Sequence, residues 1–189
     1  MKTLLKVCLW VFISLFSLLV CAGVAWQPTR MLIMVTLFPP TVIEVGDKMV
    51  DTKLLDIDGN KKHLSDYMSN KYMLLCFYST GCGPCINSVP ELKEVSEMYS
   101  ENLTLIDINL DTERYWKKSM EKRNNTWANL RDPKSHAGIA AKYGNDLGVP
   151  YFVIISPEGK VVDRWNGYRN ELIKEKMSEN ILNKITLIQ

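Results

Sequence analysis

The stretch Tyr72–Tyr78 limits the folds open to this chain more than any other part of the sequence. Its seven residues, YMLLCFY, form a short continuous apolar run that is rich in aromatic side chains. A run of this length predicts a strand buried on both faces, as in a parallel sheet covered by helices on either side. We therefore expect an α/β core.

The chain after this run alternates between helix and strand signals. Apolar side chains recur every three or four residues from Ile86 to Tyr99, which predicts one face of a helix with a kink at Pro90. Further elements are predicted as a strand at Leu103–Leu110, a polar helix at 112–123, a short helix at Ala137–Tyr143 and an amphipathic helix at Glu171–Ile185.

Two turn signals predict hairpins. Asp58-Gly59 separates residues 53–57 from 61–64, and Pro157-Glu158-Gly159 separates 151–155 from 160–165. Strands that alternate with helices over about 145 residues favour one α/β domain with a central mixed sheet flanked by helices.

The first thirty residues contain a predicted membrane-targeting segment. Val7–Trp26 contains twenty residues without a charge, enough for a helix to cross one bilayer core. Gly23-Val24-Ala25 is an acceptable cleavage site, and the residues before Cys21 loosely match a lipobox. A retained anchor, a cleaved signal peptide and a lipid-modified cysteine therefore stay open.

These alternatives share one domain plan and one compartment. We expect a signal-anchor or signal peptide at 1–27, a linker at 28–40 and the folded domain at 41–189. The domain is expected to leave the cytoplasm and face the periplasm, anchored in the inner membrane, secreted or lipidated. Disulfides persist in such a compartment.

The charge balance argues against nucleic acid as a partner. The chain has 23 basic and 21 acidic residues, and three of the basic ones precede the first acidic residue, Glu44. The remainder is thus close to neutral and lacks the basic footprint that phosphate binding needs.

The motif CGPC at residues 82–85 follows the apolar run. Two cysteines three residues apart serve either as half of a zinc site or as a reversible disulfide. Zinc needs further ligands, and the remaining cysteines and histidines are buried, in the leader or badly spaced: Cys76, Cys8, Cys21, His63 and His136. The motif therefore favours redox chemistry, with no metal and no cofactor beyond its own disulfide.

The position of the motif predicts a role for each cysteine. Cys82 is expected at a helix N-terminus, where the helix dipole and free N–H groups favour the attacking thiolate. Cys85, one turn further in, is expected to resolve the mixed disulfide. Gly83 and Pro84 provide the tight turn that lets the two sulfurs meet.

Here the chain resembles the thioredoxin superfamily, and within it the membrane-tethered TlpA/ResA-like branch, over residues 41–189. YMLLCFYSTGCGPC is similar to the family's strand and motif, and residues 44–47 together with the 52–64 hairpin are similar to the branch's N-terminal extension. Val149-Pro150 stands where the family has its cis-proline. The resemblance implies a thioredoxin-like fold, in which Val149 and Pro150 bind an extended substrate peptide like an added strand.

The chain departs from the family at three positions. Gly81 stands where thioredoxins usually have Trp, Cys76 where they have a buried Asp, and Ser88 where ResA-like proteins have a Glu. Glu91 is a substitute candidate for the missing acids, although a solvated helix charge is the simpler interpretation. Cys76 is either a third redox partner or, more simply, a small buried hydrophobe.

These patterns predict an extracytoplasmic thiol–disulfide oxidoreductase. The CGPC sequence is typical of reducing thioredoxins, which favours a reductant or isomerase acting on protein thiols and disulfides and supplied by a transmembrane electron donor. A Cu(I) carrier or cytochrome assembly factor using the same cysteines stays open. A thiol peroxidase fits less well, because Leu75 and Ser79 replace the Pro and Thr of the P-x-x-x-T-x-x-C pattern.

Overall fold

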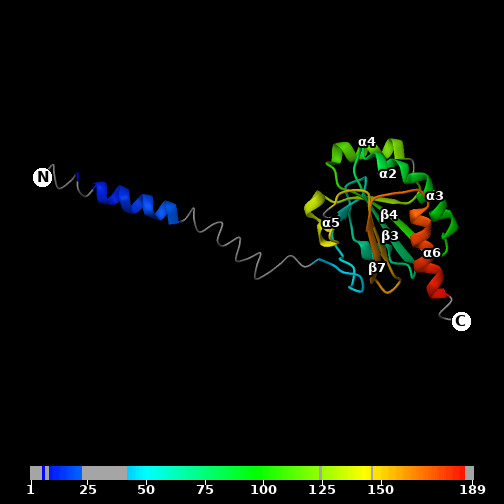
Figure 1. Cartoon of the computed structure of the whole chain (residues 1–189). Coiled ribbons are helices and arrows are strands. Elements are labelled where there is room, and N and C mark those ends of the chain that lie inside the picture. Colours follow the sequence, from blue (N-terminus) through cyan, green and yellow to red (C-terminus); the bar gives the residue numbers. More distant parts are fainter. Residues whose placement is uncertain (1–5, 7–8, 23–41, 124, 146, 186–189) are drawn as a thin grey trace. The chain divides into compact units, whose positions relative to one another are not determined.

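The computed structural model of the chain describes residues 6, 9–22, 42–123, 125–145 and 147–185 (Figure 1). The chain divides into two compact units, Met1–Thr41 and Val42–Gln189. In the first unit, residues 9–22 form a helix with exposed apolar side chains.

The predicted leader lies only in part within the described residues. Residues 7–8 and 23–26 of the expected span, and the linker at 28–40, fall outside them. Within the described ranges, no helix has both the length and the apolar character needed to cross a bilayer.

The second unit is built on one mixed sheet of seven strands in the order β2-β1-β5-β4-β3-β6-β7. The strands are β1 (Leu54–Leu55), β2 (Lys61–Lys62), β3 (Tyr72–Tyr78), β4 (Leu103–Asn109), β5 (Ala128–Arg131), β6 (Tyr151–Ile155) and β7 (Val161–Asn166). β3 pairs in parallel with β4 and antiparallel with β6, so the predicted mixed sheet is confirmed.

Helices cover both faces of this sheet (Figure 1). They are η1 (Leu64–Tyr67), α2 (Gly83–Asn87), α3 (Val89–Met98), α4 (Glu113–Arg123), η2 (Ser135–Ala137), α5 (Ile139–Lys142) and α6 (Leu172–Ile185). All seven residues of β3 are buried, because alternate side chains enter two different cores. Phe77 packs with α5 on one face, and Leu74 packs with α3 and α6 on the other.

The structure differs from the expected elements in two places. The helix predicted from Ile86 is interrupted at Ser88, and Pro90 lies in the first turn of α3 instead of in a helix interior. Proline is tolerated there, since the first N–H groups of a helix have no intrahelical partner. Strand β5 was not predicted, because its sequence ANLR is short and partly polar.

Glu91 on α3 is buried and is held by the N-terminus of α6. Its side-chain oxygens accept hydrogen bonds from the backbone N–H groups of Glu171 at 3.0 Å and Lys174 at 2.9 Å. Partial burial and a hydrogen bond to this carboxylate raise the pKa of Tyr168 to about 12. The interpretation of Glu91 as a solvated charge is therefore wrong, and the carboxylate fastens α6 to α3.

We expect Glu91→Ala to lower the free energy of unfolding by about 1–2 kcal/mol, since two N–H groups at a helix N-terminus lose their acceptor. Urea unfolding of the full chain in a mild detergent, followed by circular dichroism, measures the loss. Glu97→Ala, an exposed position on the same helix, is the matched control and should change stability by less than about 0.5 kcal/mol. Equal stabilities for the two variants would contradict a capping role.

Candidate active site

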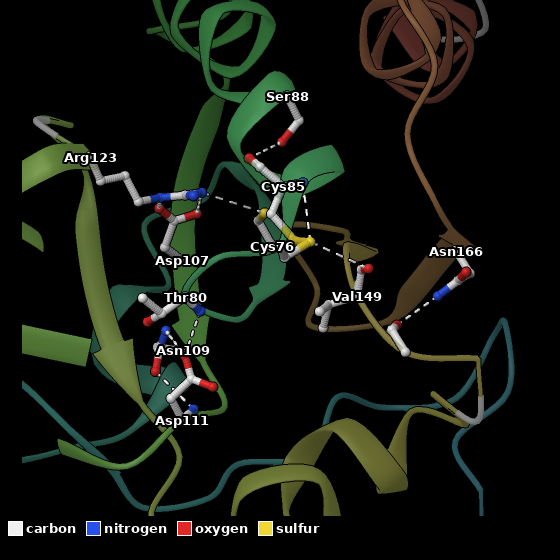
Figure 2. The surroundings of a disulfide bond; sticks show 12 residues. Cys76, Thr80, Cys85, Ser88, Asp107, Asn109, Asp111, Arg123, Val149 and Asn166 are labelled. Carbon is white, nitrogen blue, oxygen red and sulfur yellow. Dashed lines mark hydrogen bonds and ion pairs between the residues drawn. A yellow bond between two sulfur atoms is a disulfide. The ribbon is translucent and has the colours of Figure 1, made fainter. Parts of the chain in front are cut away.

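The two motif cysteines form a disulfide at the amino end of α2 (Figure 2). Their Cα atoms lie 5.2 Å apart, within the usual range for disulfides. Cys82 is the N-cap residue, and its Sγ accepts the backbone N–H of Cys85 at 3.2 Å. Cys85 is fully buried whereas Cys82 is partly exposed. This difference in exposure is the one expected of an attacking Cys82 and a resolving Cys85.

Hydrogen bonds hold the loop before the motif in place. The backbone N–H of Thr80 donates to the Asp111 carboxylate, and its hydroxyl donates to the Tyr115 carbonyl at 3.1 Å. Gly81 adopts a left-handed conformation with φ 81°. Any residue with a side chain would be strained at this φ, which gives a physical reason for glycine at a position where thioredoxins usually have Trp.

The loop at Val149 lies against the disulfide. The Val149–Pro150 peptide bond is cis, as the resemblance implied. The carbonyl oxygen of Val149 is 3.5 Å from Cys82 Sγ. Hydrogen bonds hold both sides of the loop to β7 and the residue after it, from the Asn166 amide to the Gly148 carbonyl at 2.7 Å and from the Gly167 N–H to the Pro150 carbonyl at 2.8 Å.

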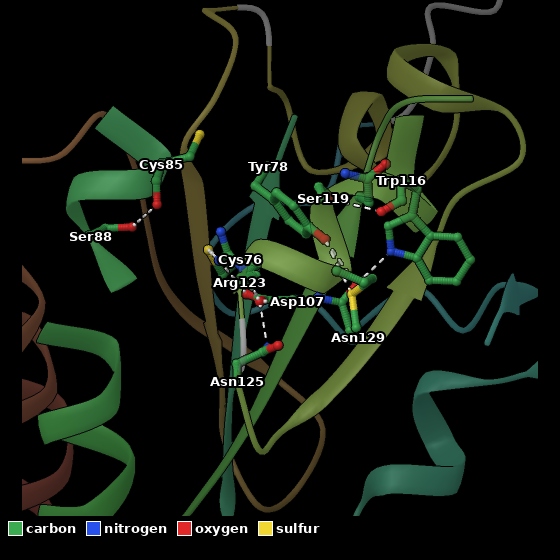
Figure 3. A network of polar contacts seen from close by, with 12 residues as sticks. Cys76, Tyr78, Cys85, Ser88, Asp107, Trp116, Ser119, Arg123, Asn125 and Asn129 are labelled. Atoms are coloured by element: carbon green, nitrogen blue, oxygen red, sulfur yellow. Dashed lines mark hydrogen bonds and ion pairs between the residues drawn. The ribbon is translucent and has the colours of Figure 1, made fainter. Parts of the chain in front are cut away.

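A buried ion pair lies beside Cys76 (Figure 3). Asp107 is the β4 residue in register with Cys76 on β3, and its carboxylate binds Arg123 with distances of 2.6 Å to Nε and 3.0 Å to Nη2. The side chains are 0% and 6% exposed, respectively. Asn125 and Asn129 also donate to the same carboxylate, so its charge is well compensated.

This network extends to the wall of the Cys85 site. Asn129 Oδ1 accepts hydrogen bonds from the Tyr78 hydroxyl at 3.0 Å and from Trp116 Nε1 at 2.7 Å. Tyr78 and Trp116 pack with Cys85 in one buried cluster. The guanidinium carbon of Arg123 lies 4.0 Å from the centre of the Tyr78 ring, and burial together with the Asp107 charge raises the pKa of Tyr78 to about 12.

Cys76 is a free, fully buried thiol, and Arg123 Nη2 is 4.0 Å from its sulfur. Burial and the neighbouring Asp107 charge raise the pKa of Cys76 well above its usual range. A thiol that stays protonated is a poor nucleophile, which favours the small buried hydrophobe over a third redox partner. Ser88, which stands where ResA-like proteins have a Glu, donates a hydrogen bond from its hydroxyl to the Cys85 carbonyl at 2.9 Å.

The structure brings Cys82, Cys85 and Val149 together as the sequence predicted. It also reveals Asp107, Arg123 and Asn129, which sequence reasoning missed. One signal for Asp107 existed, because it is the only charge in the apolar strand LTLIDINL. No comparable signal marked Arg123, which ends a polar helix. In the part of the chain that the structure describes, no group of three His, Cys, Asp or Glu side chains is placed to hold a metal ion.

Comparisons with known proteins agree with this geometry. The model of the AhpC/TSA family matches residues 45–164. The thioredoxin-like protein YneN of Bacillus subtilis is 27% identical over 64% of this chain and 71% of its own length. The thiol-disulfide oxidoreductase ResA of Bacillus cereus is 28% identical over 76% of this chain and 80% of its own length. A solved thiol-disulfide oxidoreductase from Bacteroides fragilis, 26% identical, superimposes with a TM-score of 0.60 over 70% of this chain and 98% of its own.

Proposed function

The chain belongs to the AhpC/TSA family of thioredoxin-like proteins, and from that premise we propose that it is an extracytoplasmic reductant or isomerase of protein disulfides. The activity class is thiol–disulfide oxidoreduction, which relatives named ResA support. The single observation that carries the proposal is the Cys82–Cys85 disulfide at the N-terminus of α2, beside the cis Val149–Pro150 bond.

The exchange reaction uses both cysteines in turn. In the reduced protein the Cys82 thiolate attacks one sulfur of a substrate disulfide, and the other substrate sulfur leaves as a thiolate that takes up a proton. The Cys85 thiolate then attacks Cys82 Sγ, which re-forms the disulfide within the motif and releases the second substrate thiol. Two electrons pass from the protein to its substrate.

Local contacts favour the first of these steps. The Cys85 N–H that points at Cys82 Sγ stabilises a negative charge on that sulfur, as does the amino end of α2. The Val149 backbone lies close enough to Cys82 to pair with an extended substrate segment. We propose that Val149 and Pro150 position the substrate disulfide in this way.

The remaining parts of the proposal concern location and electron supply. Val7–Trp26 would anchor the chain in the inner membrane, with residues 41–189 facing the periplasm. A reductant in that compartment needs electrons from the other side of the membrane, so we propose a transmembrane donor as partner. No contact among the described residues favours a copper carrier or a peroxidase, and neither is proposed.

Thiol trapping in intact cells tests the direction of electron flow. Cells are quenched with acid, denatured and alkylated, and the mass shift of each cysteine-containing peptide is read. We expect Cys82 and Cys85 mostly alkylated, because a donor keeps the pair reduced. Cys76 is the internal reference, since it is free and should be alkylated whatever the state of the motif. A mostly oxidised pair would contradict the role as a reductant.

A further inference from the structure

A pocket opens beside the motif, on the side where α4 packs. Its volume is about 630 Å³, within the range of pockets that bind small ligands. Tyr78 and Arg123 contribute to it from the polar network described above, and Ile86, Val89 and Pro90 give it an apolar lining. The loop residue Gly81, which directly precedes Cys82, also lines it. The pocket therefore adjoins the site of exchange.

The pocket is separate from the Val149 loop. Val149 contacts Cys82 and does not line the pocket. Figure 2 shows Arg123 and Val149 on different sides of the disulfide. A polypeptide joined to Cys82 through one cysteine can therefore contact Val149 with one flank and the pocket with the other. Ile86, one of the residues that line the pocket, has an apolar side chain that is 59% exposed.

The charged side chains that line the pocket are all basic. Its lining includes Lys93 from α3, Lys118 from α4 and Arg123, and none of the described lining residues is acidic. Asp107 compensates the charge of Arg123. Lys93 and Lys118 are exposed, and neither forms an ion pair with a described side chain, whereas Lys117 and Lys174 are paired with acids. The pocket thus combines an apolar lining with two exposed lysines that form no ion pair with a described side chain.

We propose that this pocket binds an acidic residue, together with an apolar neighbour, next to the reacting cysteine of the substrate polypeptide. The proposal rests on the proposed function and names the substrate class of that same site. The apolar lining accepts the neighbour, and the two ammonium groups attract the carboxylate. Charges at the rim of a binding site act mainly on association and on the choice of partner. They give an otherwise near-neutral domain a local preference for acidic clients.

Two synthetic peptides test the preference. Each carries one intramolecular disulfide, and they differ only in having Glu-Leu-Glu or Gln-Leu-Gln beside the first cysteine. The reduced full chain in a neutral detergent is mixed with each peptide, and the second-order rate constants are compared. We divide the rate constant for the acidic peptide by the rate constant for the amide peptide. We expect this ratio to be about five-fold higher in the wild type than in Lys93→Gln/Lys118→Gln. The ratio should also fall in 1 M salt, where charges are screened within about 3 Å.

The control variant removes the same charge elsewhere. Lys53→Gln/Lys61→Gln changes two exposed lysines on and beside the β1–β2 hairpin and should keep the wild-type ratio. The pocket proposal would be contradicted if the ratio of rate constants were equal in the wild type and the pocket variant. It would also be contradicted if the ratio fell as far in the control variant as in the pocket variant.

A binding measurement tests the pocket proposal independently of the proposed oxidoreductase function. Fluorescently labelled versions of both peptides, with serine in place of each cysteine, are titrated with the full chain and followed by anisotropy. If the acidic peptide binds more tightly but neither disulfide peptide is reduced, the pocket proposal stands and the proposed oxidoreductase function is wrong. If both disulfide peptides are reduced but the two serine peptides bind equally, the function stands and the pocket proposal is wrong.

Discussion

Cys82→Ser is expected to remove disulfide reductase activity to below detection, because a serine hydroxyl forms neither the attacking thiolate nor a mixed disulfide. Cys85→Ser should behave differently. It keeps the attacking sulfur but lacks the group that resolves the intermediate, so a mixed disulfide with the substrate should accumulate. Reduction of a disulfide peptide in the presence of dithiothreitol measures the first effect, and mass spectrometry under non-reducing conditions measures the second.

The control for both variants is Cys21→Ser, which replaces an exposed free cysteine of the first unit. We expect wild-type activity from it. Activity that survives in Cys82→Ser would exclude Cys82 as the nucleophile. A mixed disulfide trapped in Cys82→Ser instead of Cys85→Ser would reverse the two roles.

Asp107→Asn is expected to lower the free energy of unfolding by about 3–5 kcal/mol, the usual result of breaking a buried ion pair from one side. The substitution leaves the Arg123 guanidinium buried without its counter-charge, although the shape of residue 107 hardly changes. It also weakens the acceptor for Asn125 and Asn129. Urea unfolding of the full chain in detergent, compared with the wild type, measures the loss.

Two further variants separate charge from packing at this site. Glu113→Gln breaks the exposed pair with Lys117, whose atoms are 2.7 Å apart, and should lower the stability far less than Asp107→Asn does, because solvent screens this pair. Asp107→Leu combined with Arg123→Met removes both buried charges and should regain most of the stability lost in Asp107→Asn. A loss below about 1 kcal/mol for Asp107→Asn would show that water reaches Arg123.

The sequence was most informative where one local pattern determines the structure. Seven consecutive apolar residues have few alternatives to a central strand, and β3 has the predicted bounds. The CGPC motif places Cys82 at a helix N-terminus by the same local logic, since Pro84 fits a first helical turn. The Val149–Pro150 pair was identified by its register with a known family, and its place beside Cys82 follows from the pairing of β3 with β6.

The features that sequence reasoning missed depend on contacts between distant segments. Glu91 has the sequence context of a surface charge, and only the packing of α6, eighty residues later, makes it a buried cap. Asp107 and Arg123 are sixteen residues apart and meet because α4 returns across the sheet. Strand β5 is too short and polar to stand out, and it forms because β4 and β1 offer partners on both sides.

The short strand β2 has a consequence for how the sheet ends. It forms one end of the sheet, and it consists of two lysines, Lys61 and Lys62. An exposed sheet edge invites any extended chain to pair with it, and brevity and positive charge are what discourage such pairing. The sheet is thereby protected at this end against pairing with another extended chain, including the sheet edge of a second copy of the domain.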